Sequence, residues 1–354
     1  MELPPLFNPS NDMALAANVR QYFPPRRIQQ MEEDLAGLAR FWDNGPWGWS
    51  LATKQRYLRM GIPDNELPSD EWLATHRRLS SRKFAVEYYR NLVPLFSPHE
   101  GGRYPLLPCM AQFCKSIEEV ELRIYNSLSP NYLTNGQFTI GQFLTQPLNP
   151  QSSILNSQSS ILNPQSKTIL KSPWSSSGRG NIVIDSPEAF EESRKRIERI
   201  IREQGGISVE PFYANKALDF AMEFWIGDEG VRFLGYSVFF TDETGHYGGN
   251  WVESQEQLSE RIQLPSELLE SLITHHKQAL AELPYRGPVG IDMMRMDDGR
   301  VHPCVEINFR MTMGLLALLL YNKGIRDDQF LSGRADGFTA QIRQGRLCLT
   351  APIK

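Results

Sequence analysis

The sequence predicts an α+β fold of two to three structural units, with mainly antiparallel hairpins in its second half. Its 354 residues divide into that number of units at roughly 150 residues each. Strand-like segments alternate with amphipathic helical ones, and short turn signals separate them. Hydrophobic residues make up 41% and charged residues 22% of the chain, which supplies a core and excludes wholesale disorder.

Charge and cysteine content exclude several classes of protein. The chain has 37 Lys and Arg against 41 Asp and Glu, so it lacks the basic surplus of a nucleic-acid binder. Its four cysteines form no C-x-x-C pair, which argues against a zinc knuckle or a disulfide framework. No secretory signal is visible, and the longest apolar run, 314–321, is too short to cross a bilayer. We therefore expect a cytoplasmic protein that binds neither nucleic acid nor membrane.

The first half of the chain is irregular. Residues 3–7 are expected to form a strand, 8–12 a turn and 13–19 a helix. Residues 150–156 (PQSSILN) are followed by a near copy at 157–163 (SQSSILN), and prolines at both borders break any helix. Ser, Asn, Gln and Pro dominate here, so 147–166 is interpreted as an exposed insertion without chemistry.

The second half is well patterned. Ser186 caps a helix with Pro187 at its first position, and Gly205 ends that helix. Apolar residues alternate along 217–226, so we expect a strand with one buried face and with Glu223 on the other face. The remaining predicted strands are 167–172, 181–185, 207–212, 231–241, 288–296 and 300–309, and the remaining helices are 266–283 and one that begins near 314.

A loop of small residues follows the strand that carries Lys171. Residues 174–180 read WSSSGRG, so backbone N–H groups can approach an anion closely, and Lys171 would add a point charge. The loop is neither a Walker A nor a dinucleotide fingerprint, because it joins two strands and no G-K-S/T follows. A phosphate-binding loop and an ordinary hairpin with a surface lysine both remain open.

The hairpin around Asp297-Asp298-Gly299 carries two acidic residues of interest. If the turn has three residues with Gly299 left-handed, Asp292 is a same-face diagonal neighbour of Glu306. A two-residue turn would place the two carboxylates on opposite faces, and we predict the three-residue register. Pro303 lacks the N–H that a central strand needs, so one-sided pairing is expected there.

Oxygen donors on this hairpin suit a hard divalent cation. Asp292, Glu306 and Asn308 would supply the protein ligands of Mg²⁺, which commonly takes one or two carboxylates plus substrate phosphates. Arg310, on the same strand face, would stabilise charge that develops during a reaction. The alternative is a polar, solvated face on which Arg310 pairs with Glu306.

The segment 208–213 (SVEPFY) offers backbone groups to an adenine ring. Pro211 keeps its carbonyl and Tyr213 keeps its N–H, while Asp219 would accept from ribose hydroxyls. In isolation the same segment is a strand that ends in a turn.

In this order, the three pieces resemble the ATP-grasp superfamily over roughly residues 75–325. A lysine precedes a small-residue loop (Lys171 and SSSGRG), Glu210 begins the adenine segment, and G-x-D and E-x-N strands follow at 290–292 and 306–308. Lys83 is similar to a further family lysine, although a solvated helix lysine is the alternative. The resemblance implies two α+β subdomains that clamp ATP, preceded by a small Rossmann-like α/β domain.

The resemblance also implies a role for each matching residue. Arg310 and Lys171 would be catalytic, and Asp292, Glu306 and Asn308 would hold Mg²⁺ or Mn²⁺. The implied nucleotide contacts are Lys83, Lys171, Ser176, Ser177, Gly178, Gly180, Glu210, Pro211, Tyr213 and Asp219.

The implied reaction is a ligation. ATP would phosphorylate a small-molecule carboxylate, and an amine would displace phosphate from the acyl phosphate, leaving ADP. A kinase acting on a hydroxyl and a nucleotide-binding module without turnover are the alternatives. The acid, the amine and the oligomeric state are left open, as is any role of His246.

The implied domain organisation places an N-terminal domain at 1–80 and the ATP-grasp domain at 81–330. Its lid subdomain would span about 110–208 with the insertion 147–166, and 331–354 would be a C-terminal extension.

Overall fold

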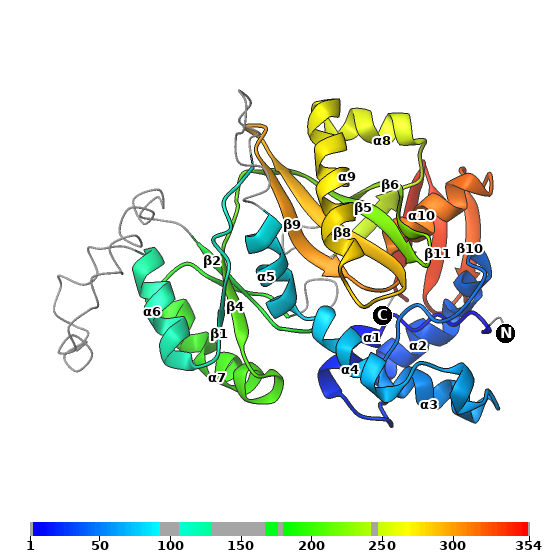
Figure 1. Ribbon diagram of the computed structural model, residues 1–354, viewed down its shortest axis with the longest axis horizontal. Helices are drawn as coiled ribbons and strands as arrows, with labels where there is room; N and C mark the ends of the chain where they lie inside the picture. The colour runs from blue at the N-terminus through cyan, green and yellow to red at the C-terminus, as the bar shows by residue number, and fades with distance from the viewer. Residues whose placement is uncertain (1–2, 93–105, 129–166, 176–179, 242–246, 353–354) are drawn as a thin grey trace. The chain divides into compact units, whose positions relative to one another are not determined.

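The computed structural model describes residues 3–92, 106–128, 167–175, 180–241 and 247–352, which form two compact α+β units (Figure 1). Unit 1 comprises residues 1–109, 174–180 and 215–354, and unit 2 comprises 110–173 and 181–214. The predicted insertion at 147–166 lies outside the described residues.

In its described residues, unit 2 is a four-stranded antiparallel sheet with two helices. Its strands are β1 (Gln112–Cys114), β2 (Thr168–Lys171), β3 (Ile182–Ile184) and β4 (Ile207–Pro211), in the order β1-β4-β2-β3. Helices α6 (Ile117–Leu128) and α7 (Pro187–Gln204) lie beside this sheet in Figure 1, and their buried side chains share a core with it. The predicted cap of α7 is confirmed, because the Ser186 side chain accepts a hydrogen bond from the Ala189 N–H and Gly205 ends the helix with φ 80°.

Unit 1 contains an eight-stranded antiparallel sheet in the order β10-β11-β12-β7-β6-β5-β8-β9. Its strands are β5 (Lys216–Gly227), β6 (Gly230–Thr241), β7 (Tyr247–Trp251), β8 (Gly287–Met296), β9 (Val301–Asn308), β10 (Gln329–Gly333), β11 (Thr339–Arg343) and β12 (Arg346–Thr350). Its α-helices are α1 (Asn11–Ala17), α2 (Arg26–Asp34), α3 (Leu51–Arg59), α4 (Asp70–Leu79), α5 (Arg82–Leu92), α8 (Gln255–Ile262), α9 (Ser266–Ala281) and α10 (Met313–Asn322).

Helices cover both faces of the central strand β5. On one face His276 of α9 contacts the ring of Phe224. On the other, the start of α10 lies so close that a Cβ at Gly314 would collide with Glu223 and Ser237. The predicted strand is confirmed, but its face with Glu223 is buried rather than open, because α10 packs on it.

The β8–β9 hairpin confirms the three-residue turn and corrects the register beyond it. Gly299 is left-handed with φ 81°, and Met294 pairs with His302 as that turn requires. A bulge between Asp292 and Met294 then shifts the pairing, so Asp292 lies directly opposite Glu306 instead of diagonal to it. Pro303 falls in the bulged stretch of β9, and β9 is the last strand of the sheet, where a residue without an N–H is tolerated.

The compact units do not follow the predicted division at residues 80 and 330. Between residues 3 and 80 the structure has helices and one isolated bridge, from Leu6 to Pro46, so a Rossmann-like α/β domain is wrong for this segment. Pro4 and Pro5 remove two N–H donors that a strand at 3–7 would need. Residues 331–354 are not a separate extension either, because β10, β11 and β12 join the large sheet through β7.

Candidate functional site

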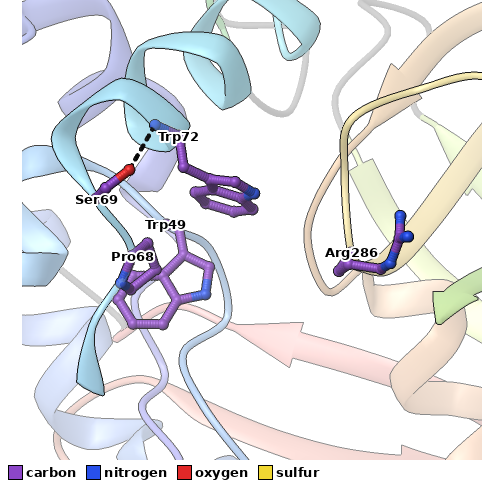
Figure 2. Close-up of a pocket in the computed structure, with 5 residues that line it drawn as sticks. All are labelled: Trp49, Pro68, Ser69, Trp72 and Arg286. Carbon is purple, nitrogen blue, oxygen red and sulfur yellow. Dashed lines mark hydrogen bonds between the residues drawn. The ribbon is translucent and has the colours of Figure 1, made fainter. Parts of the chain in front are cut away.

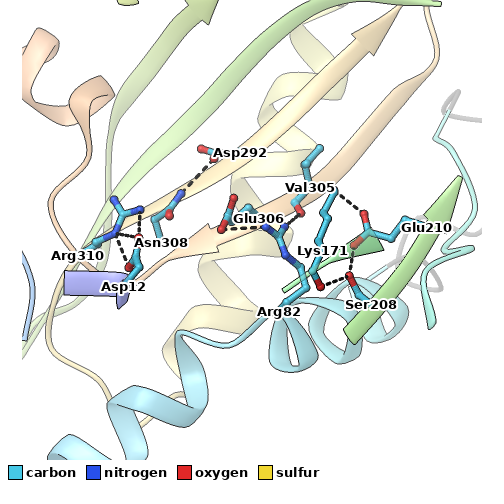
Figure 3. Close-up of polar contacts among 10 residues, drawn as sticks. All are labelled: Asp12, Arg82, Lys171, Ser208, Glu210, Asp292, Val305, Glu306, Asn308 and Arg310. Atoms are coloured by element: carbon cyan, nitrogen blue, oxygen red, sulfur yellow. Dashed lines mark hydrogen bonds and ion pairs between the residues drawn. The ribbon is translucent and has the colours of Figure 1, made fainter. Parts of the chain in front are cut away.

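An acidic pair occupies adjacent positions on β8 and β9. Asp292 and Glu306 are register partners, and the Asn308 Nδ2 donates to Asp292 Oδ2 at 3.1 Å (Figure 3). This bond uses the amide N–H of Asn308 and leaves its carbonyl oxygen as a donor atom for a cation. The three predicted metal residues are therefore brought together on one sheet edge.

The electrostatics of this pair favour a bound cation. Burial raises the pKa of Asp292 well above its usual range, and the negative charges of Glu306 and Glu223 raise it further. A divalent ion beside the carboxylates would offset that repulsion. Two carboxylates and one amide oxygen fit Mg²⁺, which commonly takes one or two carboxylates from the protein. The described residues contain no larger group, of three or more His, Cys, Asp or Glu, that could hold a metal ion.

Two arginines flank the acidic pair, each with its own acceptor. The guanidinium of Arg310 faces Asp12 of α1, with Nη2 2.8 Å from Asp12 Oδ2. Arg82 of α5 places Nη2 3.1 Å from Glu306 Oε1 and donates from Nη1 to the Val305 carbonyl at 2.8 Å. The alternative pairing of Arg310 with Glu306 is not what the structure shows (Figure 3).

The structure separates Lys83 from the acidic pair. Lys83 is half exposed and lies 3.8 Å from Glu87, one turn along α5, whereas the side chain of Arg82 is 5% exposed. Successive residues on a helix point about 100° apart, so only one of the two can face the sheet. Arg82 lies on the same helix face as the buried residues Ala85, Val86 and Tyr89, which follow it by three, four and seven positions. This helical periodicity could have identified Arg82 in the sequence.

A third carboxylate, that of Glu223, lies near the Asp292–Glu306 pair. The sequence patterns did not identify it as functional. It is 1% exposed and accepts hydrogen bonds from the hydroxyls of Ser237 and Thr312, each at 2.9 Å. Burial raises its pKa to about 7, although these two hydrogen bonds act in the opposite direction.

The raised pKa of Glu223 predicts a pH-dependent stability. Because the folded-state pKa of Glu223 exceeds its ordinary value of 4.5, folding favours the protonated carboxyl. This contribution to stability is lost as pH rises from 4.5 to about 7. We compare the unfolding free energy of the wild type with that of Glu223→Gln at about pH 4 and at about pH 8. The wild-type value, measured relative to the variant, should be lower at about pH 8 by up to about 3 kcal/mol. Urea unfolding at both pH values measures it, and an unchanged difference between the two proteins would contradict it.

In unit 2, Lys171 and Glu210 form a buried ion pair. Lys171 Nζ lies 2.6 Å from Glu210 Oε2, and the Ser208 hydroxyl donates to Glu210 Oε1 at 2.7 Å. The antiparallel register places Lys171 opposite Ser208 across β2 and β4, which brings the lysine to Glu210 (Figure 3). The predicted phosphate lysine and hinge glutamate thus meet within one unit.

The other predicted nucleotide contacts that the structure describes are distributed over both units. Pro211 ends β4 and Tyr213 follows it, while Gly180 precedes β3. Asp219 of β5 accepts from Lys216 Nζ at 2.5 Å and from the Thr241 hydroxyl at 3.0 Å. Ser176, Ser177, Gly178 and His246 lie outside the described residues.

A separate cavity of about 400 Å³ lies in unit 1 away from the predicted site residues. Trp49, Pro68, Ser69 and Trp72 line it opposite Arg286 (Figure 2). Trp72 stacks on His76 and Tyr285, so an aromatic stack supports this wall.

Among the described residues, we find no helix that combines the length and the apolar character needed to span a bilayer.

The G-x-D and E-x-N strands pair in one α+β unit, and the Lys171–Glu210 pair lies in the other. These are the features on which the resemblance to the ATP-grasp superfamily rests. The α+β architecture that this resemblance implies is the one observed in both units.

Comparison with known proteins gives a distant set of relatives. No family model matches the chain. A curated relative, the [butirosin acyl-carrier protein]--L-glutamate ligase of Niallia circulans, is 26% identical over 177 residues, which are 49% of this chain and 40% of that protein. The chain thus matches less than half of that relative's length.

Two solved structures illustrate the low structural similarity. An L-amino acid ligase from Bacillus licheniformis is 14% identical with a TM-score of 0.42, covering 76% of this chain and 54% of the other. An N5-carboxyaminoimidazole synthetase from Staphylococcus aureus, complexed with ADP, is 10% identical with a TM-score of 0.40, covering 68% and 52%. Similarity this low does not by itself assign an activity or a substrate.

Proposed function

We propose that the chain is an ATP- and Mg²⁺-dependent ligase that joins a carboxylate to an amine through an acyl phosphate and releases ADP and phosphate. The observation that carries the proposal is the direct pairing of Asp292 with Glu306, with Asn308 bonded to Asp292. This is the oxygen-rich arrangement that a magnesium nucleotide requires.

The proposed chemistry has two steps. A carboxylate oxygen attacks the γ-phosphorus of ATP and the bond to the β–γ bridging oxygen breaks, so ADP leaves with that electron pair. The amine then attacks the acyl carbon, the bond from that carbon to the phosphate oxygen breaks, and the nitrogen loses its proton as inorganic phosphate departs. Asp292, Glu306 and Asn308 would hold Mg²⁺, which when bound neutralises phosphate charge.

Two cationic side chains have separate roles in this proposal. Lys171 would bind phosphate oxygens as a point charge, exchanging Glu210 for the nucleotide as its partner. Arg310 would donate N–H groups to the acyl phosphate and to the tetrahedral adduct, where negative charge develops.

The substrates are proposed only by class. A small-molecule carboxylate and a small amine are the first candidates, with no nucleic acid or membrane partner. The curated relative is named for an acyl-carrier protein and L-glutamate, so a carrier-bound acid with an amino acid as amine is the second candidate. A cytoplasmic location stays a prediction.

An acyl-trapping assay tests the proposal. The protein is incubated with ATP, MgCl₂, candidate acids and hydroxylamine, and acyl hydroxamate is measured together with nucleotide products. Hydroxamate with stoichiometric ADP supports the ligase. Hydroxamate with AMP and pyrophosphate contradicts it, because adenylation breaks a different bond.

The same assay separates the alternatives. A stable phosphate ester with ADP and no hydroxamate would indicate a kinase that acts on a hydroxyl. Stabilisation by Mg·ATP without turnover of any acid would indicate a binding module.

A further inference from the structure

The guanidinium of Arg310 is held by an acid 298 residues away in the sequence. Arg310 Nε lies 3.0 Å from Asp12 Oδ1 and 3.2 Å from Oδ2, and Nη2 lies 2.8 Å from Oδ2. Nη1 donates to the Met311 carbonyl at 3.1 Å. Of the five N–H donors of an arginine, these bonds leave one on each terminal nitrogen for a further acceptor.

The segment that carries Asp12 is tied to the loop after β9. The Met311 N–H donates to the Trp47 carbonyl at 2.8 Å, which joins that loop to residues 47–49. The Asn8 amide donates to the Gly48 carbonyl at 2.9 Å, and the turn into α1 begins at the same place. Asp12 is therefore presented to Arg310 by a segment that a backbone bond and a side-chain-to-backbone bond hold in place.

Arg310 lies among competing acids. Asp12, Glu306 and Asp292 all exert an electrostatic attraction on its guanidinium. The side chains of Arg310 and Asp12 are 16% and 12% exposed, so their attraction is only partly screened by water. An arginine released from Asp12 would be drawn towards the two carboxylates that are proposed to hold the metal.

We propose that Asp12 is a positioning residue that keeps Arg310 off the Asp292–Glu306 pair and orients its two remaining N–H donors. The inference rests on the proposed function for its catalytic part only. The segment that carries Asp12 lies outside the ATP-grasp-like motifs, yet it would set both the orientation of Arg310 and the availability of the proposed metal ligands.

A double-mutant cycle with Asp12→Asn, Arg310→Gln and the double variant tests the inference. In the hydroxamate assay we expect Asp12→Asn to lower kcat by about 10- to 100-fold, with KM for ATP changed by less than about threefold. The double variant should match Arg310→Gln within about twofold, because Asp12 acts through that arginine. Losses that multiply in the double variant would overturn the inference, since they would show a separate structural role.

Binding of Mn²⁺, used as a probe of the metal site, gives a readout without turnover. Asp12→Asn should weaken Mn²⁺ binding by about 10-fold or more, because freed Arg310 pairs with the ligands. The double variant should regain at least wild-type affinity, since the competing cation is gone. Weak Mn²⁺ binding in both variants would overturn the inference even if the enzyme proved not to be a ligase.

Two controls guard against misfolding. Asp70→Asn removes an acid of the same N-terminal segment, which pairs with Lys54 and Arg20, and should change neither readout. If Asp12→Asn alone fails to fold, the double variant still decides, because it leaves no unpaired buried charge. Wild-type Mn²⁺ affinity in a folded Asp12→Asn protein would contradict the proposal outright.

Discussion

Replacing Asp292 with Asn, or Glu306 with Gln, is expected to lower Mg·ATP-dependent turnover by at least about 1,000-fold without loss of the fold. Each substitution keeps the side-chain shape and removes one negative charge from the only pair of register partners proposed to hold the metal. The charge also costs stability in the absence of metal, because burial and Glu306 raise the pKa of Asp292. The melting temperature of Asp292→Asn in metal-free buffer should therefore equal or exceed that of the wild type.

Turnover, Mn²⁺ affinity and melting temperature are the three measurements for this prediction. Asp298→Asn is a matched control, because Asp298 lies in the turn of the same hairpin and pairs with Arg300 away from the ligands. It should keep wild-type activity. Near-wild-type turnover in both Asp292→Asn and Glu306→Gln would remove the metal assignment.

The second large effect is expected at Lys171. Lys171→Met should lower kcat/KM for ATP by about 100-fold, because it removes the proposed phosphate contact. It should also destabilise the protein by about 3–5 kcal/mol, since it removes one partner of a buried ion pair. The paired side chains are only 9% and 8% exposed, so water cannot readily replace the lost partner.

The variant Lys171→Met with Glu210→Gln separates these two effects. Removing both charges should recover most of the lost stability, because no unpaired buried ion remains, while kcat/KM stays low. Lys167→Met is the control, since Lys167 is half exposed and pairs with Asp185 at 3.6 Å. Recovery of wild-type activity in the double variant would show that Lys171 serves only to neutralise Glu210.

Local patterns were enough to select the central residues of the candidate site. Lys171, Asp292 and Glu306 were predicted to lie on strands, and the structure confirms those strands; their roles stay predictions. The turn at Gly299 was predictable for the same reason, because a left-handed glycine in a three-residue loop is a local preference.

Non-local packing supplied what the sequence could not. Asp12 has no pattern that links it to Arg310, and nothing in an alternating strand shows that α10 buries Glu223. The bulge that sets Asp292 opposite Glu306 lies in the stretch of β9 that contains Pro303, and the alternation of the strand did not reveal it. Arg82 is the exception, because its helical phase with Ala85 and Tyr89 was available in the sequence.

The sequence by itself determined the α+β character and most strands and helices after residue 167, because these follow from periodicity and turn chemistry. It also supplied the residues that are proposed to bind phosphate or a divalent cation. The tertiary structure alone decided that β10–β12 complete the large sheet, that Glu223 is buried, and that Asp12 rather than Glu306 receives Arg310. Those outcomes depend on contacts between distant segments, whose free energies appear only when the chain is folded.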